Sequence, residues 1–210
     1  MVSYHHDGKL IVDTNVEEFF QDRVTEAIGN QNLRATEEVV HYVVNLLTAY
    51  TNAKALYEET PDGLMIKPLA LMYAEAVDAA SVEERNQALK RLGDVALFIA
   101  GIFPNSLNRK LVDIDYYIAM GGNAYGHLSG IAKDTLRWQV FSSIFKELSI
   151  KFTQFVDVLS EVSEKVNLSN DSDIMRLYEI WIRTGSERTA RRLRQLGIHP
   201  FTGSVSRRQH

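Results

Sequence analysis

Apolar residues recur with helical spacing along most of the chain, and its 4 prolines leave the long stretch between Pro104 and Pro200 uninterrupted. After Thr36, for example, apolar side chains recur at i, i+3 and i+4, which places them on one face of a helix. The same spacing predicts helices over 16–28, 36–58, 67–80, 82–103, 115–132 and 134–166, and two short helices within 172–197. We therefore predict an all-α bundle of six to eight helices.

The strongest periodic signal lies between residues 134 and 166. Its apolar positions advance in alternating steps of four and three, through Phe141, Phe145, Leu148, Phe152, Phe155, Leu159, Val162 and Val166. A heptad seam without Gly or Pro predicts one continuous helix, about 50 Å long at ~1.5 Å per residue. We interpret this spine helix as the axis of the bundle, and as a surface that could extend across a homodimer interface.

Segment 115–132 is rich in glycine, and its small residues have helical spacing. They form one stripe, consisting of Ala119, Gly122, Gly126 and Ser129. The preceding helix carries a matching stripe of Gly93, Ala96 and Ala100. Because the link after Pro104 is short, the two helices should be antiparallel neighbours. We predict a close-packed hairpin over about 82–131, with the glycines at its seam. The spacing matches neither a dinucleotide-binding loop nor a P-loop.

Two short segments towards the N-terminus depart from the helical pattern. Residues 7–12 (DGKLIV) and 62–67 (DGLMIK) each place an Asp-Gly turn signal before a run of apolar residues. This similarity predicts that the two segments pair as a minimal two-stranded ribbon.

The composition is that of an ordinary globular domain, with 210 residues, of which 45% are hydrophobic and 24% charged. We predict a single helical domain over 1–197, in which a basic helical hairpin (172–197) is an appendage, followed by a flexible tail (198–210). The absence of cysteine excludes disulfides, thiolate nucleophiles, Fe–S clusters and cysteine zinc sites. Neither a secretory signal nor a membrane-spanning run is recognisable, so we expect a cytoplasmic protein.

Four polar side chains beside the hairpin seam could line a ligand pocket. They are Asp94, Tyr116, Asn123 and His127. A carboxylate, a phenol, an amide and an imidazole near a seam of small residues have the capacity for general acid–base chemistry. The alternative is a solvated or hydrogen-bonded face, in which Asp94 pairs with Lys90 or Arg91 along its own helix.

The C-terminal part of the chain is strongly basic. Residues 182–210 contain seven arginines and one glutamate, a net charge of +6 that leaves −10 on residues 1–181. The arginines of the last predicted helix and its approach are Arg183, Arg188, Arg191, Arg192 and Arg194. They could bind the phosphates of a nucleic acid or nucleotide, or a partner protein; alternatively, the basic helix rests on the acidic body. We favour a basic helix that rests on the acidic body, because the pI of the chain is about 5.9 and nucleic-acid-binding domains are usually basic. In addition, the match to a helix-turn-helix is poor and no aromatic residues interleave with the arginines.

Motifs for metal binding and catalysis are missing or incomplete. Glu38 and His41 have the Glu-x-x-His spacing of di-iron bundles, but no second copy occurs, and both lie opposite the apolar face of their helix. We predict no metal and no other cofactor. Because no nucleophile motif occurs either, we expect a non-enzymatic regulatory or adaptor protein that acts through protein–protein contacts and forms a homodimer. Phosphate or nucleic-acid binding by the arginines, and ligand binding or catalysis at the pocket, are the alternatives.

Overall fold

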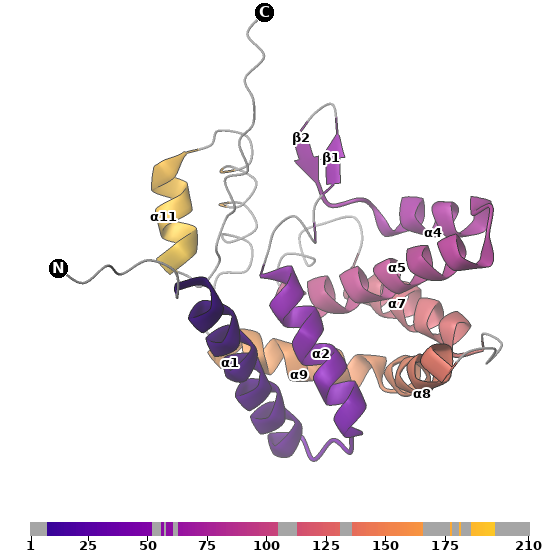
Figure 1. Ribbon diagram of the computed structural model, residues 1–210, viewed down its shortest axis with the longest axis horizontal. Helices are drawn as coiled ribbons and strands as arrows, with labels where there is room; N and C mark the ends of the chain where they lie inside the picture. Colours follow the sequence, from indigo (N-terminus) through magenta and orange to yellow (C-terminus); the bar gives the residue numbers. More distant parts are fainter. Residues whose placement is uncertain are drawn as a thin grey trace, which may run out of the picture.

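The computed structural model describes residues 8–51, 56, 58–60, 63–104, 113–130, 136–165, 177, 181 and 186–195. Within these residues the chain is an all-α bundle, as predicted, with one short β-hairpin (Figure 1). The helices are α1 (Gly8–Asn30), α2 (Glu37–Tyr50), α4 (Leu69–Asp78), α5 (Val82–Ile102), α7 (Ile114–Ser129), α8 (Leu136–Ile150), α9 (Phe152–Lys165) and α11 (Glu187–Gln195). The strands are β1 (Glu58–Thr60) and β2 (Gly63–Met65). The predicted tail, 198–210, lies outside the described residues, and the predicted domain limits stay a prediction.

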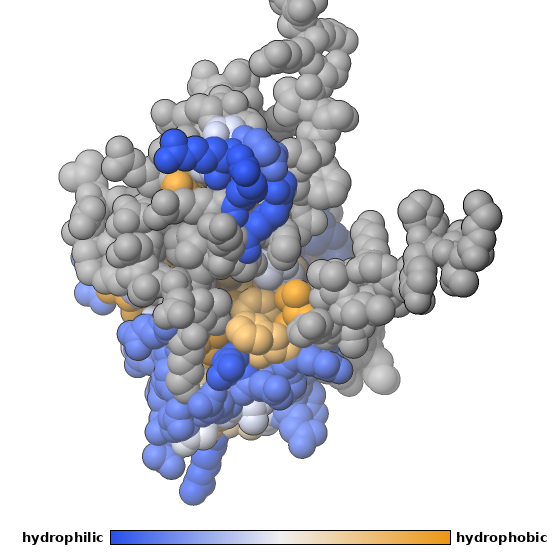
Figure 2. Space-filling model, turned by 90° about the vertical axis from the view of Figure 1, so that its left-hand side faces the viewer, coloured by the Kyte–Doolittle hydropathy of each residue, from blue (hydrophilic) through white to orange (hydrophobic). Residues whose placement is uncertain are grey.

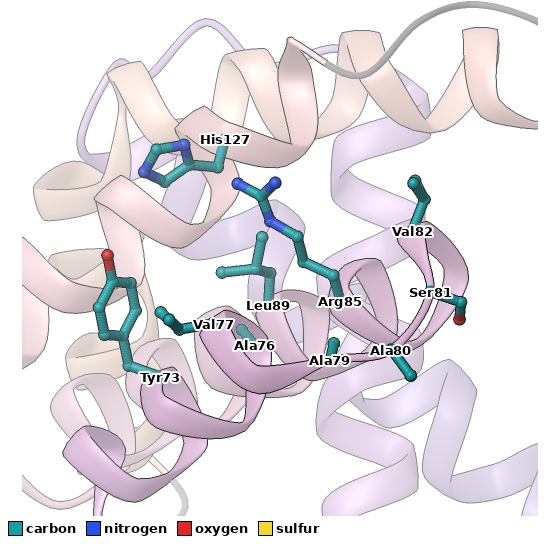
Figure 3. Close-up of a pocket in the computed structure, with 10 residues that line it drawn as sticks. All are labelled: Tyr73, Ala76, Val77, Ala79, Ala80, Ser81, Val82, Arg85, Leu89 and His127. Carbon is teal, nitrogen blue, oxygen red and sulfur yellow. The ribbon is translucent and has the colours of Figure 1, made fainter.

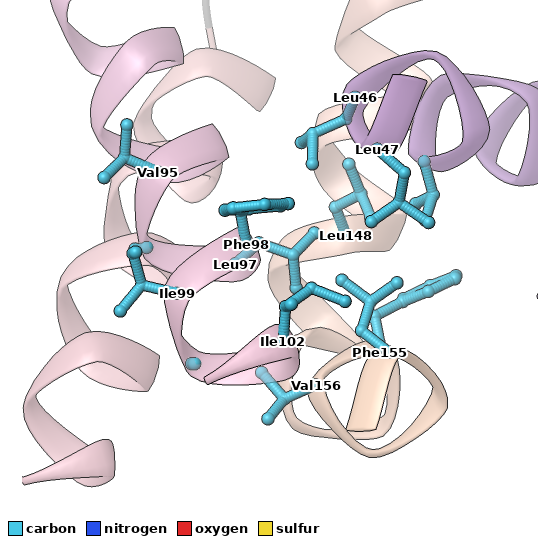
Figure 4. Packing of buried hydrophobic residues seen from close by; sticks show 14 of the residues in the cluster. Leu46, Leu47, Val95, Leu97, Phe98, Ile99, Ile102, Leu148, Phe155 and Val156 are labelled. Carbon is cyan, nitrogen blue, oxygen red and sulfur yellow. The ribbon is translucent and has the colours of Figure 1, made fainter. Parts of the chain in front are cut away.

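Helix α5 is the centre of the bundle, and α2, α4, α7 and α9 all pack against it. Every residue from Leu92 to Ile102 is buried, so this half of the helix is enclosed on all sides. Figure 4 shows Phe98 and Ile102 of α5 meeting Leu47 of α2 and Phe155 of α9 in the core between the helices. The enclosed position explains why this stretch of α5 is nearly continuous in apolar residues rather than amphipathic.

Each helix of the α5–α7 hairpin begins at a side-chain cap. The Glu84 N–H donates to Ser81 Oγ at 3.2 Å, and Glu84 Oε2 accepts at 3.0 Å from the N–H of Ala80, the residue before the N-cap, an arrangement close to a capping box. At α7 the Asp113 carboxylate accepts from the Tyr116 N–H at 3.1 Å. These bonds satisfy backbone donors that a helix leaves unpaired at its start.

The predicted spine helix is divided at Lys151 into α8 and α9. Helical backbone bonds still continue at this point, since the Lys151 N–H donates to the Glu147 carbonyl at 2.9 Å and the Lys151 carbonyl accepts from the Phe155 N–H at 3.0 Å. The division is therefore a bend between α8 and α9 (Figure 1). Helix α8 packs on α7 and α2, whereas α9 packs on α5 and α1. The break lets each half follow its own neighbours, a tertiary requirement that the heptad pattern does not contain.

The apolar seam of the spine is used within a single chain. Six of its positions are buried, namely Phe145, Leu148, Phe152, Phe155, Leu159 and Val162. Phe141 is partly buried and packs against the same core, and Val166 lies outside the described residues. The seam therefore forms core, and the described seam positions provide no exposed surface for the predicted homodimer.

The predicted hairpin of α5 and α7 is confirmed, but α7 turns a different face towards α5. A Cβ added to Gly93 would lie 2.5 Å from the Tyr125 ring, and one added to Gly121 would lie 2.8 Å from the Ala96 Cβ. A Cβ added to Gly126, expected at this seam, would instead lie 3.9 Å from the Ser149 Cβ of α8. The reason is that the bulky Tyr125 and Leu128 of α7 take the buried side, which turns the predicted glycine stripe away by roughly a third of a turn.

Two predictions near the N-terminus are corrected. Residues 8–12 belong to α1 and not to a strand, so they do not pair with 62–67. Strand β2 pairs instead with its sequence neighbour β1 in an antiparallel hairpin, with Glu58 opposite Met65. Helix α2 ends at Tyr50 rather than at Glu58, because the chain must leave the helix to form β1.

A polar cluster at the break in the spine ties α8 to the start of α2. Glu147 accepts from the Thr36 N–H at 3.2 Å, from the Thr36 hydroxyl at 2.9 Å and from Lys151 Nζ at 2.9 Å. Desolvation by burial raises the pKa of Glu147, but the hydrogen bonds from Lys151 and Thr36 outweigh it and hold the pKa below its usual value. A tertiary contact thus supplies the cap that the Thr36 side chain does not itself form.

Candidate functional site

The structure divides the four predicted pocket residues between two places. Asp94 is buried on α5 and bonded to α2, whereas Tyr116 is half-buried and Asn123 and His127 are exposed on α7. Asp94 and His127 line separate cavities. The four side chains therefore do not surround one common ligand site.

Asp94 is the acceptor at the centre of a hydrogen-bonded network. Its Oδ1 accepts from the Tyr42 hydroxyl at 2.6 Å and from the Tyr125 hydroxyl at 2.7 Å, and its Oδ2 accepts from Lys90 Nζ at 2.6 Å. Tyr42 lies on α2 and Tyr125 on α7, so one carboxylate joins three helices. The pairing of Asp94 with Lys90, given above as the alternative to a ligand pocket, is confirmed; the two phenols were not predicted.

The two phenols of this network stay protonated well beyond neutral pH. Burial raises the pKa of Tyr42 and of Tyr125 well above the ordinary 10.0, and the negative charge of Asp94 raises both further. Burial raises the pKa of neighbouring Tyr50 in the same way. Because three donors are committed to the Asp94 carboxylate, its geometry is that of a structural tie rather than of a proton acceptor awaiting a substrate.

A cavity of about 460 Å³ lies between α2 and α5, with Asp94 in its wall. Its other lining residues are Tyr42, Asn45, Leu46, Ala49, Tyr50, Gln87, Lys90 and Arg91. The volume is in the range of small-molecule sites. However, the acid in this wall is already paired with Lys90, which also lies over the Tyr42 ring at 5.3 Å. Asp94 and Lys90 of this cavity are thus engaged with each other, and Arg91 is a further cation in its wall.

A second cavity, of about 500 Å³, lies between α4, the start of α5 and His127 of α7. Figure 3 shows the Arg85 guanidinium and the Tyr73 hydroxyl on the same side of the cavity as the His127 imidazole, with Leu89 and Val77 between them. None of the described residues that line this cavity is acidic. His127 is thus the one predicted pocket residue that the structure places in a cavity with unbalanced basic groups.

Helix α4 exposes apolar side chains next to this second cavity. Leu69, Met72 and Ala76 are buried against α5. The adjoining face, which we call the α4 strip, consists of Ala70, Tyr73, Ala74 and Val77. Tyr73 is 46% exposed and Val77 is 65% exposed. In Figure 1, α4 lies at the border of the bundle, with α5 below it in this view. The sequence analysis did not predict this surface. The signal for it was the scarcity of charged residues in α4, where only Glu75 and Asp78 are charged.

Helix α11 presents its arginines on its exposed side. Ala190 and Leu193 are buried, whereas the three arginines whose side chains are described, Arg188, Arg191 and Arg194, are exposed. Arg194 pairs with Glu187 at 2.8 Å. Arg183 and the Arg192 side chain lie outside the described part. Figure 2 shows the outer side of α11 as a hydrophilic band above a patch of apolar surface.

Metal and membrane sites receive no support from the part of the chain that is described. No three His, Asp or Glu side chains there gather closely enough to hold a metal ion. Glu38 and His41 are both exposed, as their position opposite the apolar face predicts. Among the described helices, none combines the length and the apolar character needed to cross a bilayer.

Comparison with known proteins found no matching family model, no matching curated protein and no matching solved structure. Function is therefore inferred from the geometry of the described residues.

Proposed function

We propose that this all-α protein is a non-enzymatic, cytoplasmic regulatory or adaptor protein that acts through protein–protein contacts, and that the α4 strip is its contact surface. The observation that carries the proposal is the exposure of Tyr73 and Val77 on a helix whose adjoining face is already buried. Contiguous exposed apolar surface next to a cavity is typical of a protein interaction site.

Covering the α4 strip would contribute substantially to the binding free energy of a complex. Burying a Val or aromatic side chain stabilises a complex by roughly 1.5–3 kcal/mol, and aromatic residues are enriched among the side chains that dominate binding. The alternating small residues, Ala70 and Ala74, let a partner backbone approach between Tyr73 and Val77. An apolar face of one amphipathic helical segment therefore fits the strip.

Site-specific photocrosslinking in the native host cell tests this proposal. A photoreactive amino acid replaces Val77 in the strip or, as the matched control, Ile150, which is 69% exposed but lies on α8. We expect a discrete covalent adduct with a partner protein at position 77, lost when Ala74→Glu places a charge in the strip. Equal adducts at both positions, or an adduct insensitive to Ala74→Glu, would contradict the proposal.

A second measurement on the same variant tests the predicted homodimer. Because the spine seam is buried within the chain, the α4 strip is the surface that we propose for self-association as well. Light scattering should then show a dimer that Ala74→Glu converts to a monomer. A dimer unaffected by this change would place the interface elsewhere.

Phosphate binding through α11 is a second candidate function, favoured by the exposed Arg188 and Arg191. Guanidinium groups pair with phosphate oxygens in a bidentate geometry. Binding of a single-stranded oligonucleotide should fall with rising salt and should weaken in Arg188→Gln/Arg191→Gln. The control is Arg34→Gln/Lys146→Gln, which removes the same charge from other exposed positions. Equal losses in both variants would show a nonspecific charge effect only.

A further inference from the structure

We infer that the cavity beside the α4 strip binds a carboxylate of the partner segment that covers the strip. The inference rests on the proposed function, and it adds the chemistry that selects the partner. Tyr73 and Val77 belong both to the strip and to the wall of the cavity, so one bound segment would contact both. The ligand is therefore an apolar segment with an acidic group at one end.

Three polar groups at the rim of the cavity can donate hydrogen bonds to such a carboxylate. In Figure 3 the Arg85 guanidinium extends towards the His127 imidazole, and the Tyr73 hydroxyl points to the same side. A guanidinium presents paired N–H donors that match the two oxygens of a carboxylate. A phenol and an imidazole can each add a further N–H or O–H donor.

The charge balance of the cavity favours an anion. Among the described residues, Arg85 has no ion-pair partner, and no acid lines the cavity around it. The cavity between α2 and α5 is different, because its wall contains a carboxylate, Asp94, which pairs with Lys90 at 2.6 Å beside the further cation Arg91. A carboxylate entering the Arg85 cavity gains a charge-assisted hydrogen bond, whereas one entering the other cavity would meet Asp94.

The floor of the cavity is suited to the apolar part of the ligand. Ala76, Val77, Ala79, Val82 and Leu89 contribute hydrocarbon to its lining. A volume of about 500 Å³ accommodates an acidic side chain together with a neighbouring apolar one. A highly charged ligand such as inorganic phosphate would leave this hydrocarbon uncovered, so the site fits a carboxylate on an apolar body.

A simple organic acid tests the chemistry of the cavity on the purified full chain. The probe is 4-phenylbutyrate, and its uncharged amide is the control ligand; binding is followed by NMR shifts of the Arg85, Leu89 and His127 amides. We expect saturable binding with a dissociation constant of about 1 mM, weakened roughly tenfold by Arg85→Gln. Arg188→Gln, which removes the same charge from α11, should leave the affinity unchanged. Equal affinity for acid and amide, or no saturable shift, would overturn the inference.

A second arm separates this inference from the proposed function. Excess 4-phenylbutyrate should suppress the partner adduct at position 77, and Arg85→Gln should weaken that adduct in the absence of the acid. If the acid fails to bind while the adduct persists and depends on Ala74, the strip contacts a partner but the cavity does not select it. If the acid binds and no protein adduct forms, the cavity accepts a free organic acid and the adaptor function is wrong.

Discussion

Helices α4 and α7 are both poor in charged residues and both pack against α5, yet among the described elements α7 is covered by a second helix and α4 is not. Helix α7 lies between α5 and α8, so its glycine side and its Tyr125 side both meet protein. The one described element that α4 contacts extensively is α5. Its outer face therefore keeps Val77 at 65% exposure.

The difference shows that an apolar composition predicts a helix whose surface must be covered. It does not predict whether another helix of the same chain or a second protein covers that surface. For α7 the partner, α8, is part of the same chain. For α4, no described element of the chain covers the strip, and an external partner is the proposal that follows. Substitutions in α7 should therefore change the free energy of unfolding more than substitutions in the exposed face of α4.

The largest contrast should come from the same substitution in the two helices. Leu128 of α7 is 1% exposed, whereas Leu71 of α4 is 55% exposed. We expect Leu128→Ala to lower the free energy of unfolding by about 3 kcal/mol, because it leaves a cavity in the core, and Leu71→Ala to lower it by less than ~0.5 kcal/mol. Urea denaturation measures both values. Similar losses would mean that α4 is covered in the folded chain.

Removal of the Asp94 carboxylate should have the next largest effect, because α7 depends on it and α4 does not. Asp94→Ala leaves the buried Tyr125 hydroxyl and the Tyr42 hydroxyl without their acceptor, at a cost of about 2–3 kcal/mol. Asp94→Asn keeps an acceptor oxygen and should cost less. Equal urea midpoints for the Ala and Asn variants would show that the network contributes little.

The glycine positions of α7 sharpen the comparison within one helix. Gly121→Ala would push a methyl group against Phe152 and Ala96, and we expect a net loss of about 1–2 kcal/mol from overpacking. Gly126→Ala has its nearest neighbour at 3.9 Å, so it should gain about 0.5–1 kcal/mol of helix propensity. Thermal melts of the two variants should therefore shift in opposite directions. Two shifts of the same sign would show that the orientation of α7 is wrong.

Alkaline pH should weaken the α7 side of the core. In the folded chain burial and the charge of Asp94 raise the pKa of Tyr42 and Tyr125 above 10.0. The contribution of these tyrosines to the free energy of unfolding is therefore complete below pH ~10. It is lost as the pH rises from there towards their pKa in the folded chain, by up to about 1.4 kcal/mol per pH unit for each tyrosine. Urea titrations between about pH 9 and 11 measure this slope, which Tyr125→Phe should reduce. An unchanged slope would indicate that Tyr125 is not buried as a donor to Asp94.

Features set by local sequence were predictable. Helical periodicity predicted α5 and α7, the short link after Pro104 predicted that they are neighbours, and side-chain caps at Ser81 and Asp113 mark where these helices begin. Caps and short connections depend on residues a few positions apart, so the pattern along the chain contains them.

Features set by distant neighbours were not predictable. The spine breaks at Lys151 without Gly or Pro, because its two halves follow different helices. Tyr42 reaches Asp94 from 52 positions away in the sequence. The side of α7 that faces α5 depends on how Tyr125 fits beside Gly93, and helical spacing alone allows either stripe.

The smallest expected effect on stability is also the test that bears most directly on function. Ala74 is exposed in the α4 strip, and glutamate is a good helix former, so Ala74→Glu should change the free energy of unfolding by less than ~0.5 kcal/mol. The same change should abolish partner contact at position 77, because a partner would have to bury the new carboxylate without compensation. A stable, folded Ala74→Glu protein that still forms the adduct would remove α4 as the contact surface and leave its exposed apolar face without a function.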